Sequence, residues 1–234
     1  MKRRTRPIGL PRDARDGTRG VYTLGMDTAA RARRDPQLRR AVATLLALAL
    51  ALSASPSAWA ETAYLAGGCF WCMESDFEGL PGVEDVVSGF TGGTVENPTY
   101  NGDHTGHYEA VEITYDPSIV SYQDLLDHYW VNIDPFDAAG QFCDKGPSYR
   151  AAIFVSTPEE RRLAEQSKRE IQAMFPGQPV VTEILDASTF YPIKGDESYH
   201  QDYYKKSPLR YKFYRYSCGR DARLKEIWGD RTTH

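Results

Sequence analysis

Residues 67–72 read GGCFWC, which places two of the chain's four cysteines on either side of a Phe-Trp pair and directly after two glycines. A cysteine pair at this spacing has four common uses: a structural disulfide, a redox couple, half of a metal site, or a nucleophile with a second thiol beside it. Each use requires different partners, so the rest of the sequence decides between them.

Cys69 is the better candidate for a nucleophile. A short strand is predicted at 62–68 (TAYLAGG), and a helix is predicted to begin at Cys69. Unpaired backbone amides and the helix dipole favour a thiolate there, and Cys72 lies a turn further in, where this effect is weaker. The glycines allow a sharp turn and leave space over the sulfur. Core packing alone would explain Phe70 and Trp71, but not the glycines, the helix start or the cysteine.

The metal and redox-couple interpretations fit less well. A metal site needs a second half, and Cys143 and Cys218 have no Cys or His nearby at ligand spacing. His104 and His107 lack carboxylate partners at ligand spacing, so we interpret them as residues that shape their loop. We therefore expect no metal. A thioredoxin-type couple tends to carry Pro or Gly between its cysteines rather than Phe-Trp.

Strands and helices are interleaved along residues 61–234. The predicted strands are 62–68, 83–90, 108–116, 151–156 and 179–185, and the predicted helices are 69–80, 121–133 (capped by Ser121) and 157–175 (capped by Thr157 and Glu160). The strands are few and partly alternating, which favours an α+β two-layer domain over a doubly wound sheet. The 17-residue polar loop 91–107 is long enough to be functional. After the last strand the chain is aromatic, and we expect it to be rich in loops.

The first 60 residues have the three parts of a secretory signal peptide: an arginine-rich start, the apolar run 41–52 (AVATLLALALAL) and an Ala-x-Ala ending at Ala60. The apolar run is shorter than the roughly 20 residues that span a bilayer. We therefore predict export, cleavage after Ala60 and a periplasmic location. Met26 is a candidate for the true start, because the region before it reads like upstream sequence.

Cleavage would change the charge of the protein. The chain holds 28 Lys+Arg and 32 Asp+Glu, of which residues 1–60 hold 12 and 4, so residues 61–234 carry 16 and 28 and a formal charge of −12. Such a surface repels nucleic acid and anionic membranes. We expect one monomeric catalytic domain over 61–234, with neither nucleic acid nor membrane as a partner.

Five segments together resemble the A-type peptide methionine sulfoxide reductases over residues 61–229. They are GGCFWCMES (67–75), FTGGTVENPTY (90–100), TGHYEAVEITYDPSIVSYQDLL (105–126), GPSYRAAIF (146–154) and YHQDYYKKSP (199–208). The Gly-Cys-Phe-Trp core is specific, and the other segments follow in the family's order. The resemblance implies an α+β fold with a ferredoxin-like mixed sheet. It also implies reduction of methionine S-sulfoxide, free or in peptides, without a bound cofactor.

The family's site residues fall on Cys69, Phe70, Trp71, Tyr100, Glu109, Asp144 and Tyr149. The resemblance makes Cys69 the nucleophile and Glu109 the proton donor. It assigns the substrate's S-methyl group to the aromatic pair and the sulfoxide oxygen to the two tyrosines, with the aspartate lining the same site. A sulfoxide oxygen leaves only when it is protonated, so Glu109 must be neutral near pH 7. We therefore expect Glu109 to be buried beside Cys69, with a raised pKa.

Attack on the sulfoxide leaves a sulfenic acid on Cys69, which a second thiol converts into a disulfide. Many family members use a cysteine in a mobile C-terminal segment, so we favour Cys218, with Cys72 second and Cys143 as a pocket wall or third thiol. This chain departs from the commoner pattern, because Cys72 stands where many members have Gly and only one cysteine lies near the C-terminus. The disulfide would be reduced by an external thioredoxin-like dithiol, outside the cytoplasm if the protein is exported to repair oxidised proteins there.

Two other functions would give different mutant behaviour. A thiol-disulfide oxidoreductase would use its two cysteines alone and would be indifferent to Glu109→Gln. A sulfoxide-binding or structural module would keep its function in Cys69→Ser. An assay with methionine sulfoxide and dithiothreitol on these proteins distinguishes all three functions.

Overall fold

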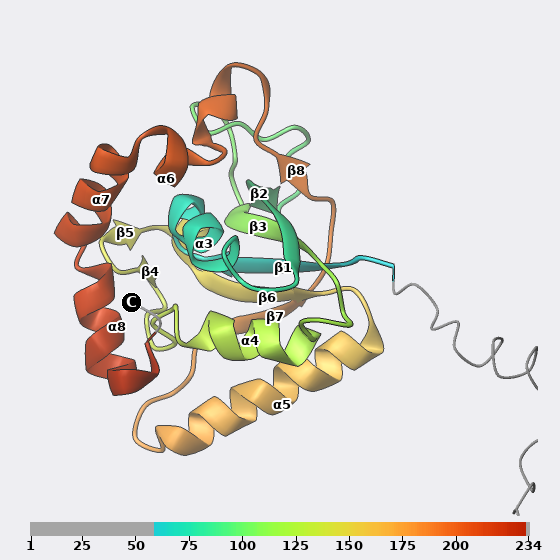
Figure 1. Ribbon diagram of the computed structural model, residues 1–234, viewed down its shortest axis with the longest axis vertical. Helices are drawn as coiled ribbons and strands as arrows, with labels where there is room; N and C mark the ends of the chain where they lie inside the picture. The colour runs from blue at the N-terminus through green and yellow to red at the C-terminus, as the bar shows by residue number, and fades with distance from the viewer. Residues whose placement is uncertain (1–58, 233–234) are drawn as a thin grey trace, which may run out of the picture. The chain divides into compact units, whose positions relative to one another are not determined.

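A six-stranded mixed sheet forms the centre of the protein (Figure 1). The computed structural model describes residues 59–232. In sheet order the strands are β7 (Glu183–Asp186), β6 (Ala151–Val155), β1 (Glu61–Gly67), β3 (Tyr108–Tyr115), β2 (Val83–Thr91) and β8 (Tyr191–Pro192). The β6–β7 pair is parallel and the other pairs are antiparallel. A separate small ladder pairs β4 (Gly140–Gln141) with β5 (Asp144–Lys145).

The core of the sheet is ferredoxin-like. The chain runs β1-α3-β2-β3-α4-β6 through the four central strands, with α3 (Phe70–Phe77) and α4 (Tyr122–Trp130) as the helices of a βαββαβ unit. These four strands lie in the order β6-β1-β3-β2 and are antiparallel throughout. The predicted α+β class and ferredoxin-like mixed sheet are confirmed.

Alternate residues of each strand enter two different apolar clusters, as the pleat requires. The larger cluster lies against α3 and α4, and its members from the central strands are Ala63, Leu65, Val86, Phe90, Val111, Ile113, Tyr115, Ala151, Ile153 and Val155. The smaller cluster, on the opposite face, consists of Ala66, Tyr108, Ala110, Ala152 and Phe154, with Leu185, Ala187 and Phe190 packed against it. Both faces of the sheet are therefore buried.

The remaining helices are α5 (Pro158–Met174), α6 (Tyr203–Lys206), α7 (Pro208–Ser217) and α8 (Arg220–Trp228), with short 3-10 turns η1 (Pro147–Tyr149), η2 (Gly195–His200) and η3 (Gly229–Arg231). The predicted caps form. Ser121 Oγ accepts a hydrogen bond from the N–H of Asp124 (3.2 Å), and Thr157 Oγ1 accepts one from the N–H of Glu160 (3.1 Å). The capping box predicted for Thr157 and Glu160 does not form, because the Glu160 carboxylate accepts from the N–H of Ser156 (2.8 Å), one residue before the cap.

The segment after β8 is largely helical, so the prediction of a loop-rich C-terminal segment was wrong. The residues that α7 and α8 bury repeat at intervals of four within each helix: they are Tyr211, Arg215, Arg220, Leu224 and Trp228. Two of these five are arginines, so the buried faces of these helices are not continuous apolar stripes that the sequence pattern would reveal.

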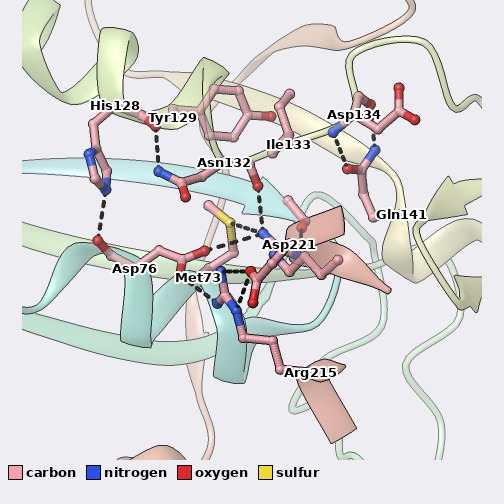
Figure 2. Close-up of polar contacts among 12 residues, drawn as sticks. Met73, Asp76, His128, Tyr129, Asn132, Ile133, Asp134, Gln141, Arg215 and Asp221 are labelled. Carbon is pink, nitrogen blue, oxygen red and sulfur yellow. Dashed lines mark hydrogen bonds and ion pairs between the residues drawn. The ribbon is translucent and has the colours of Figure 1, made fainter. Parts of the chain in front are cut away.

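Arg215 and Arg220 are buried, and both pair with the carboxylate of Asp76 of α3. Arg215 also pairs with Asp221 of α8 (Figure 2). Arg215 Nη1 lies 2.6 Å from Asp76 Oδ1, and Arg220 Nη2 lies 3.4 Å from Asp76 Oδ2. Arg220 also donates to the backbone oxygens of Asn132 (2.7 Å) and Gly67 (3.2 Å). This network joins the C-terminal helices to α3, to the end of α4 and to the end of β1.

Among the described residues, no helix is both long and apolar enough to cross a membrane. The predicted signal peptide and the alternative start at Met26 lie outside the described residues, apart from positions 59 and 60. Export therefore stays a prediction.

The ion network makes Asp76→Asn a test of how the C-terminal helices are held. The substitution keeps the size of the side chain but leaves the buried guanidinium of Arg220 without its anion and that of Arg215 with Asp221 alone. We expect this to lower the free energy of unfolding by about 3–5 kcal/mol. Equilibrium urea unfolding measures the change. Asp230→Asn, which breaks an exposed pair with Lys225, should leave the unfolding midpoint almost unchanged. Equal shifts in the two variants would contradict this account.

Candidate active site

The turn between β1 and α3 places Cys69 at the N-cap of α3, as predicted. Gly68 has φ +86°, a conformation that L-residues rarely adopt, and a Cβ on it would lie 2.6 Å from the side chain of Gln141. A Cβ on Gly67 would lie 2.3 Å from the sulfur of Met73. Both glycines are therefore required for the turn that presents Cys69.

A cavity of about 50 Å³ opens above the Cys69 sulfur. It is lined by Cys69, Phe70, Trp71, Tyr100, Glu109, Asp144, Tyr149 and Tyr214. The first seven are the catalytic and substrate-binding residues that the sequence analysis named, brought together from α3, β3, β5, η1 and the 92–107 loop. The eighth, Tyr214, comes from α7, the helix that sequence reasoning missed.

Glu109 is buried in β3, with 2% of its surface exposed, and its Oε2 accepts a hydrogen bond from the N–H of Phe70 (3.1 Å). Burial raises the pKa of Glu109 to about 8, against the opposing hydrogen bonds from Phe70 and Tyr149, and the nearby charge of Asp144 raises it further. The carboxyl group is therefore mostly protonated at pH 7. This is the environment that the sequence analysis expected for a proton donor.

The pKa values of the two free cysteines, Cys69 and Cys72, are shifted in opposite directions. Burial raises the pKa of Cys69 well above its usual value, with further increases from Cys72 and Glu109. The pKa of Cys72 is lowered, chiefly by a hydrogen bond from the Cys69 thiol and also by the positive charge of Arg220. Both sulfurs are buried, and burial disfavours a thiolate at either position, so the helix start alone does not make Cys69 the more acidic thiol.

Trp71 is held in place by residues from the C-terminal segment. Its indole Nε1 donates to Nδ1 of His200 (3.0 Å), and its ring stacks on Tyr203 with the centroids 3.9 Å apart. His200 is buried, and burial lowers its pKa, so its ring is neutral and its Nδ1 can accept the hydrogen bond from the indole N–H. No role for His200 could be predicted from the sequence; in the structure it positions Trp71, part of the aromatic wall of the cavity.

Tyr100 is held by a carboxylate that sequence reasoning also missed. The backbone N–H groups of Tyr100 and Asn101 donate to Glu197 (2.8 and 2.9 Å), which anchors the long loop on η2. Burial raises the pKa of Tyr100 to about 12 and also raises that of Tyr149. Both phenols therefore stay protonated and can donate hydrogen bonds into the cavity.

Asp144 and the second pair of cysteines form the side of the site next to α7. Burial raises the pKa of Asp144, and its carboxylate accepts a hydrogen bond from the hydroxyl of Tyr214. Cys143 and Cys218 are joined in a disulfide, while Cys69 and Cys72 are free. The donor atoms of Cys143, Asp144 and Cys218 lie within 4.8 Å of one another, but the two sulfurs are bonded to each other and offer no thiolate to a metal.

The histidines of the long loop bind their own segment. His107 is buried, and its Nε2 lies 2.9 Å from the backbone oxygen of Val95, while Nδ1 of His104 lies 3.0 Å from that of Thr99. The interpretation of both residues as loop-shaping is confirmed.

Comparison with known proteins agrees with this geometry. Residues 61–232 match the family model described as peptide methionine sulfoxide reductase. Over 192 residues the chain is 52% identical to peptide methionine sulfoxide reductase MsrA 2 of Caulobacter vibrioides, an alignment that covers 81% of this chain and 94% of the relative. The chain belongs to the peptide methionine sulfoxide reductase family.

Solved structures of the family share the fold. Methionine sulfoxide reductase A of Corynebacterium diphtheriae is 34% identical, with a TM-score of 0.56 over 67% of this chain and 78% of that one. Mxr1 from Saccharomyces cerevisiae in reduced form is 26% identical, with a TM-score of 0.58 over 66% of this chain and 88% of that one. The protein is thus an oxidoreductase of methionine sulfoxide, as the sequence analysis predicted.

The pKa of Glu109 predicts a falling rate at alkaline pH. Only the protonated carboxyl can donate, so single-turnover methionine formation by the reduced enzyme, divided by the fraction of Cys69 present as thiolate, should fall by up to about tenfold for each pH unit above about 8. Glu109→Gln should lose about 10²–10⁴-fold in rate at pH 7 and lack this fall. Quenched-flow measurement of methionine tests both points. Glu112→Gln, on the same strand, is the control, and a near wild-type rate in Glu109→Gln would refute the role of Glu109.

Proposed function

We propose that the protein reduces the S epimer of methionine sulfoxide, free or in peptides, with Cys69 as the nucleophile and Glu109 as the acid. The observation that carries this proposal is the convergence of one sulfur, one protonated carboxyl group and several aromatic rings on a single cavity. The choice of the S epimer comes from the resemblance to the A-type enzymes.

The size of the cavity favours a substrate that inserts only its end. Its volume of about 50 Å³ is far below the about 300–1,000 Å³ of sites that enclose a whole small ligand. A methyl sulfoxide group would enter, and the rest of a peptide would stay outside. Phe70 and Trp71 offer apolar surface to the methyl group, while the protonated phenols of Tyr100 and Tyr149 can donate to the sulfoxide oxygen.

The first step transfers the oxygen. The sulfur of Cys69 forms a bond to the sulfoxide sulfur while Glu109 gives its proton to the sulfoxide oxygen. The hydroxyl group then moves to the sulfur of Cys69, which breaks both the S–O bond of the substrate and the bond between the two sulfurs. The products are methionine and a sulfenic acid on Cys69, and the thiol proton of Cys69 replaces the one that Glu109 donated. The substrate sulfur is reduced by two electrons and the cysteine sulfur is oxidised by two.

The second step transfers the oxidised state from Cys69 to a disulfide between Cys143 and Cys218. Cys218 condenses with the sulfenic acid and releases water, and Cys143 then attacks Cys218, which frees Cys69 and leaves a Cys143–Cys218 disulfide. Two features support this order. The structure holds that disulfide while Cys69 is free, and Cys218 lies one helical turn after Tyr214, a residue of the cavity. Cys72, buried beside Cys69, is the alternative resolving thiol.

Disulfide mapping decides between Cys218 and Cys72. Fully reduced Cys143→Ser treated with one equivalent of methionine sulfoxide should accumulate a Cys69–Cys218 bond, because the thiol that would release it is absent. The wild type should show Cys143–Cys218, and Cys72→Ser should behave like the wild type. Peptide mass spectrometry without reduction reads all three patterns. A Cys69–Cys72 bond in Cys143→Ser would refute Cys218 as the resolving cysteine.

The external reductant we propose is a thioredoxin-like dithiol, and the setting is outside the cytoplasm, where the protein, as a monomer, would repair oxidised exported proteins. The basic, apolar and Ala-x-Ala parts of residues 1–60 support export. An oxidising compartment would also keep Cys143 and Cys218 bonded unless a dedicated reductant is delivered there.

Processing of the leader can be measured directly. The full chain expressed in a Gram-negative host should appear in the periplasmic fraction with Glu61 as its first residue, read by N-terminal sequencing. Ala58→Asp with Ala60→Asp should block cleavage, because both small residues of the cleavage site are lost. A wild-type chain that stays in the cytoplasm with an intact leader would contradict export.

A further inference from the structure

Helix α7 exposes three large side chains along one face. Leu209, Phe213 and Tyr216 are 83%, 73% and 85% exposed, and their spacing of four and three residues places them on one stripe of the helix. The opposite side of α7 buries Tyr211 and Arg215. Single exposed apolar residues are ordinary, but a continuous stripe on one helix indicates a contact surface.

The stripe runs toward the C-terminal end of α7, and the disulfide lies at that end. Cys218 caps the C-terminus of α7, two residues after Tyr216, and its bonded partner Cys143 is exposed. A thiolate that reduces this disulfide must approach one of the two sulfurs directly. Any protein that carries such a thiolate therefore covers the surface around Cys218, which includes the end of α7.

The charges beside the stripe limit the kind of protein surface that can bind it. Residues 203–220 contain six Lys and Arg and no Asp or Glu, in a domain whose formal charge is −12. Four of these cations are paired with acidic side chains. Arg210 and Lys212 are exposed next to the stripe, and neither forms an ion pair with any other residue that the structure describes. The surface is therefore apolar with a basic edge, which suits an apolar patch edged by acidic groups.

We propose that the stripe of Leu209, Phe213 and Tyr216 is the docking surface for the protein dithiol that reduces the Cys143–Cys218 disulfide. The partner is a thioredoxin-like domain with apolar and acidic side chains around its reactive cysteine. This inference rests on the proposed function, because it assumes that the disulfide is reduced in each catalytic cycle. Neither Arg210 nor Lys212 lines the cavity above Cys69, and the same is true of the stripe.

A second copy of the chain fits the surface less well. A two-fold symmetric dimer through the stripe would bring each copy's Arg210 and Lys212 close to those of its partner, which opposes association. A protein substrate has to insert a methyl sulfoxide into the cavity, and no residue of the stripe lines that cavity. The reductant is the occupant that has to approach Cys218 itself.

The test compares two reductants on the same enzyme. The triple variant Leu209→Ser, Phe213→Ser, Tyr216→Ser is assayed with thioredoxin, kept reduced by thioredoxin reductase and NADPH, and separately with dithiothreitol. We expect the KM for thioredoxin to rise about tenfold or more, while turnover with dithiothreitol is unchanged for free methionine sulfoxide and for a sulfoxide peptide. The control is Ile119→Ser with Met174→Ser, two exposed apolar residues on other elements.

Arg210→Glu with Lys212→Glu should also raise the KM for thioredoxin and weaken the dependence of this KM on salt concentration.

Several results would overturn the proposal. One is an unchanged KM for thioredoxin in the triple variant, and another is a wild type that turns over with dithiothreitol but not with thioredoxin. A higher KM for the sulfoxide peptide with dithiothreitol would make the stripe a substrate surface, and a wild-type dimer that the triple variant abolishes, seen by light scattering, would make it a self-association surface. Absence of turnover with dithiothreitol in the wild type would instead refute the proposed function.

Discussion

The rest of the structure depends on the ion pairs that the buried carboxylate of Asp76 forms. It pairs with Arg215 of α7 and Arg220 of α8, which are 7% and 2% exposed. Water cannot reach these charges, so each is tolerated only while the others are in place. Arg220 also donates to the backbone oxygen of Gly67, two residues before Cys69. The network that attaches the C-terminal helices therefore also fixes the turn that presents the nucleophile.

Closing the site with α7 creates two opposing electrostatic effects. Burial keeps Glu109 protonated, as a proton donor requires, but the same burial disfavours a thiolate on Cys69. Tyr214 acts on two groups of the site, because its hydroxyl donates to Asp144 and is also close enough to Cys69 to oppose part of the rise in the pKa of that thiol. Burial still dominates at Cys69, so the residue that closes the cavity only partly offsets the cost of closing it.

The parts of the site that could be predicted are those whose signal is local. Residues 67–72 carry the glycine turn, the nucleophile and the aromatic wall in one contiguous motif, and Ser121 and Thr157 mark their helices by capping chemistry. Burial of Glu109 could be expected because its neighbours in β3 are apolar. His200 and Glu197 could not be assigned, since each acts on a residue about 100 or more positions away, through a hydrogen bond that no periodicity records.

The C-terminal helices escaped prediction for a reason that also bears on how they work. A helix with apolar residues on its inner face and a second apolar stripe outside would be apolar nearly all round, and packing alone would not decide which side is buried. In α7 the inner face is fixed by Arg215 against Asp76, an interaction that the outer face cannot imitate. The outer residues Leu209, Phe213 and Tyr216 are therefore left exposed beside Cys218 without competing for the core. Arg215 interrupts the apolar pattern on the inner face of α7, so the helix could not be recognised in the sequence. Its pairing with Asp76 also determines which face of α7 is exposed to solvent.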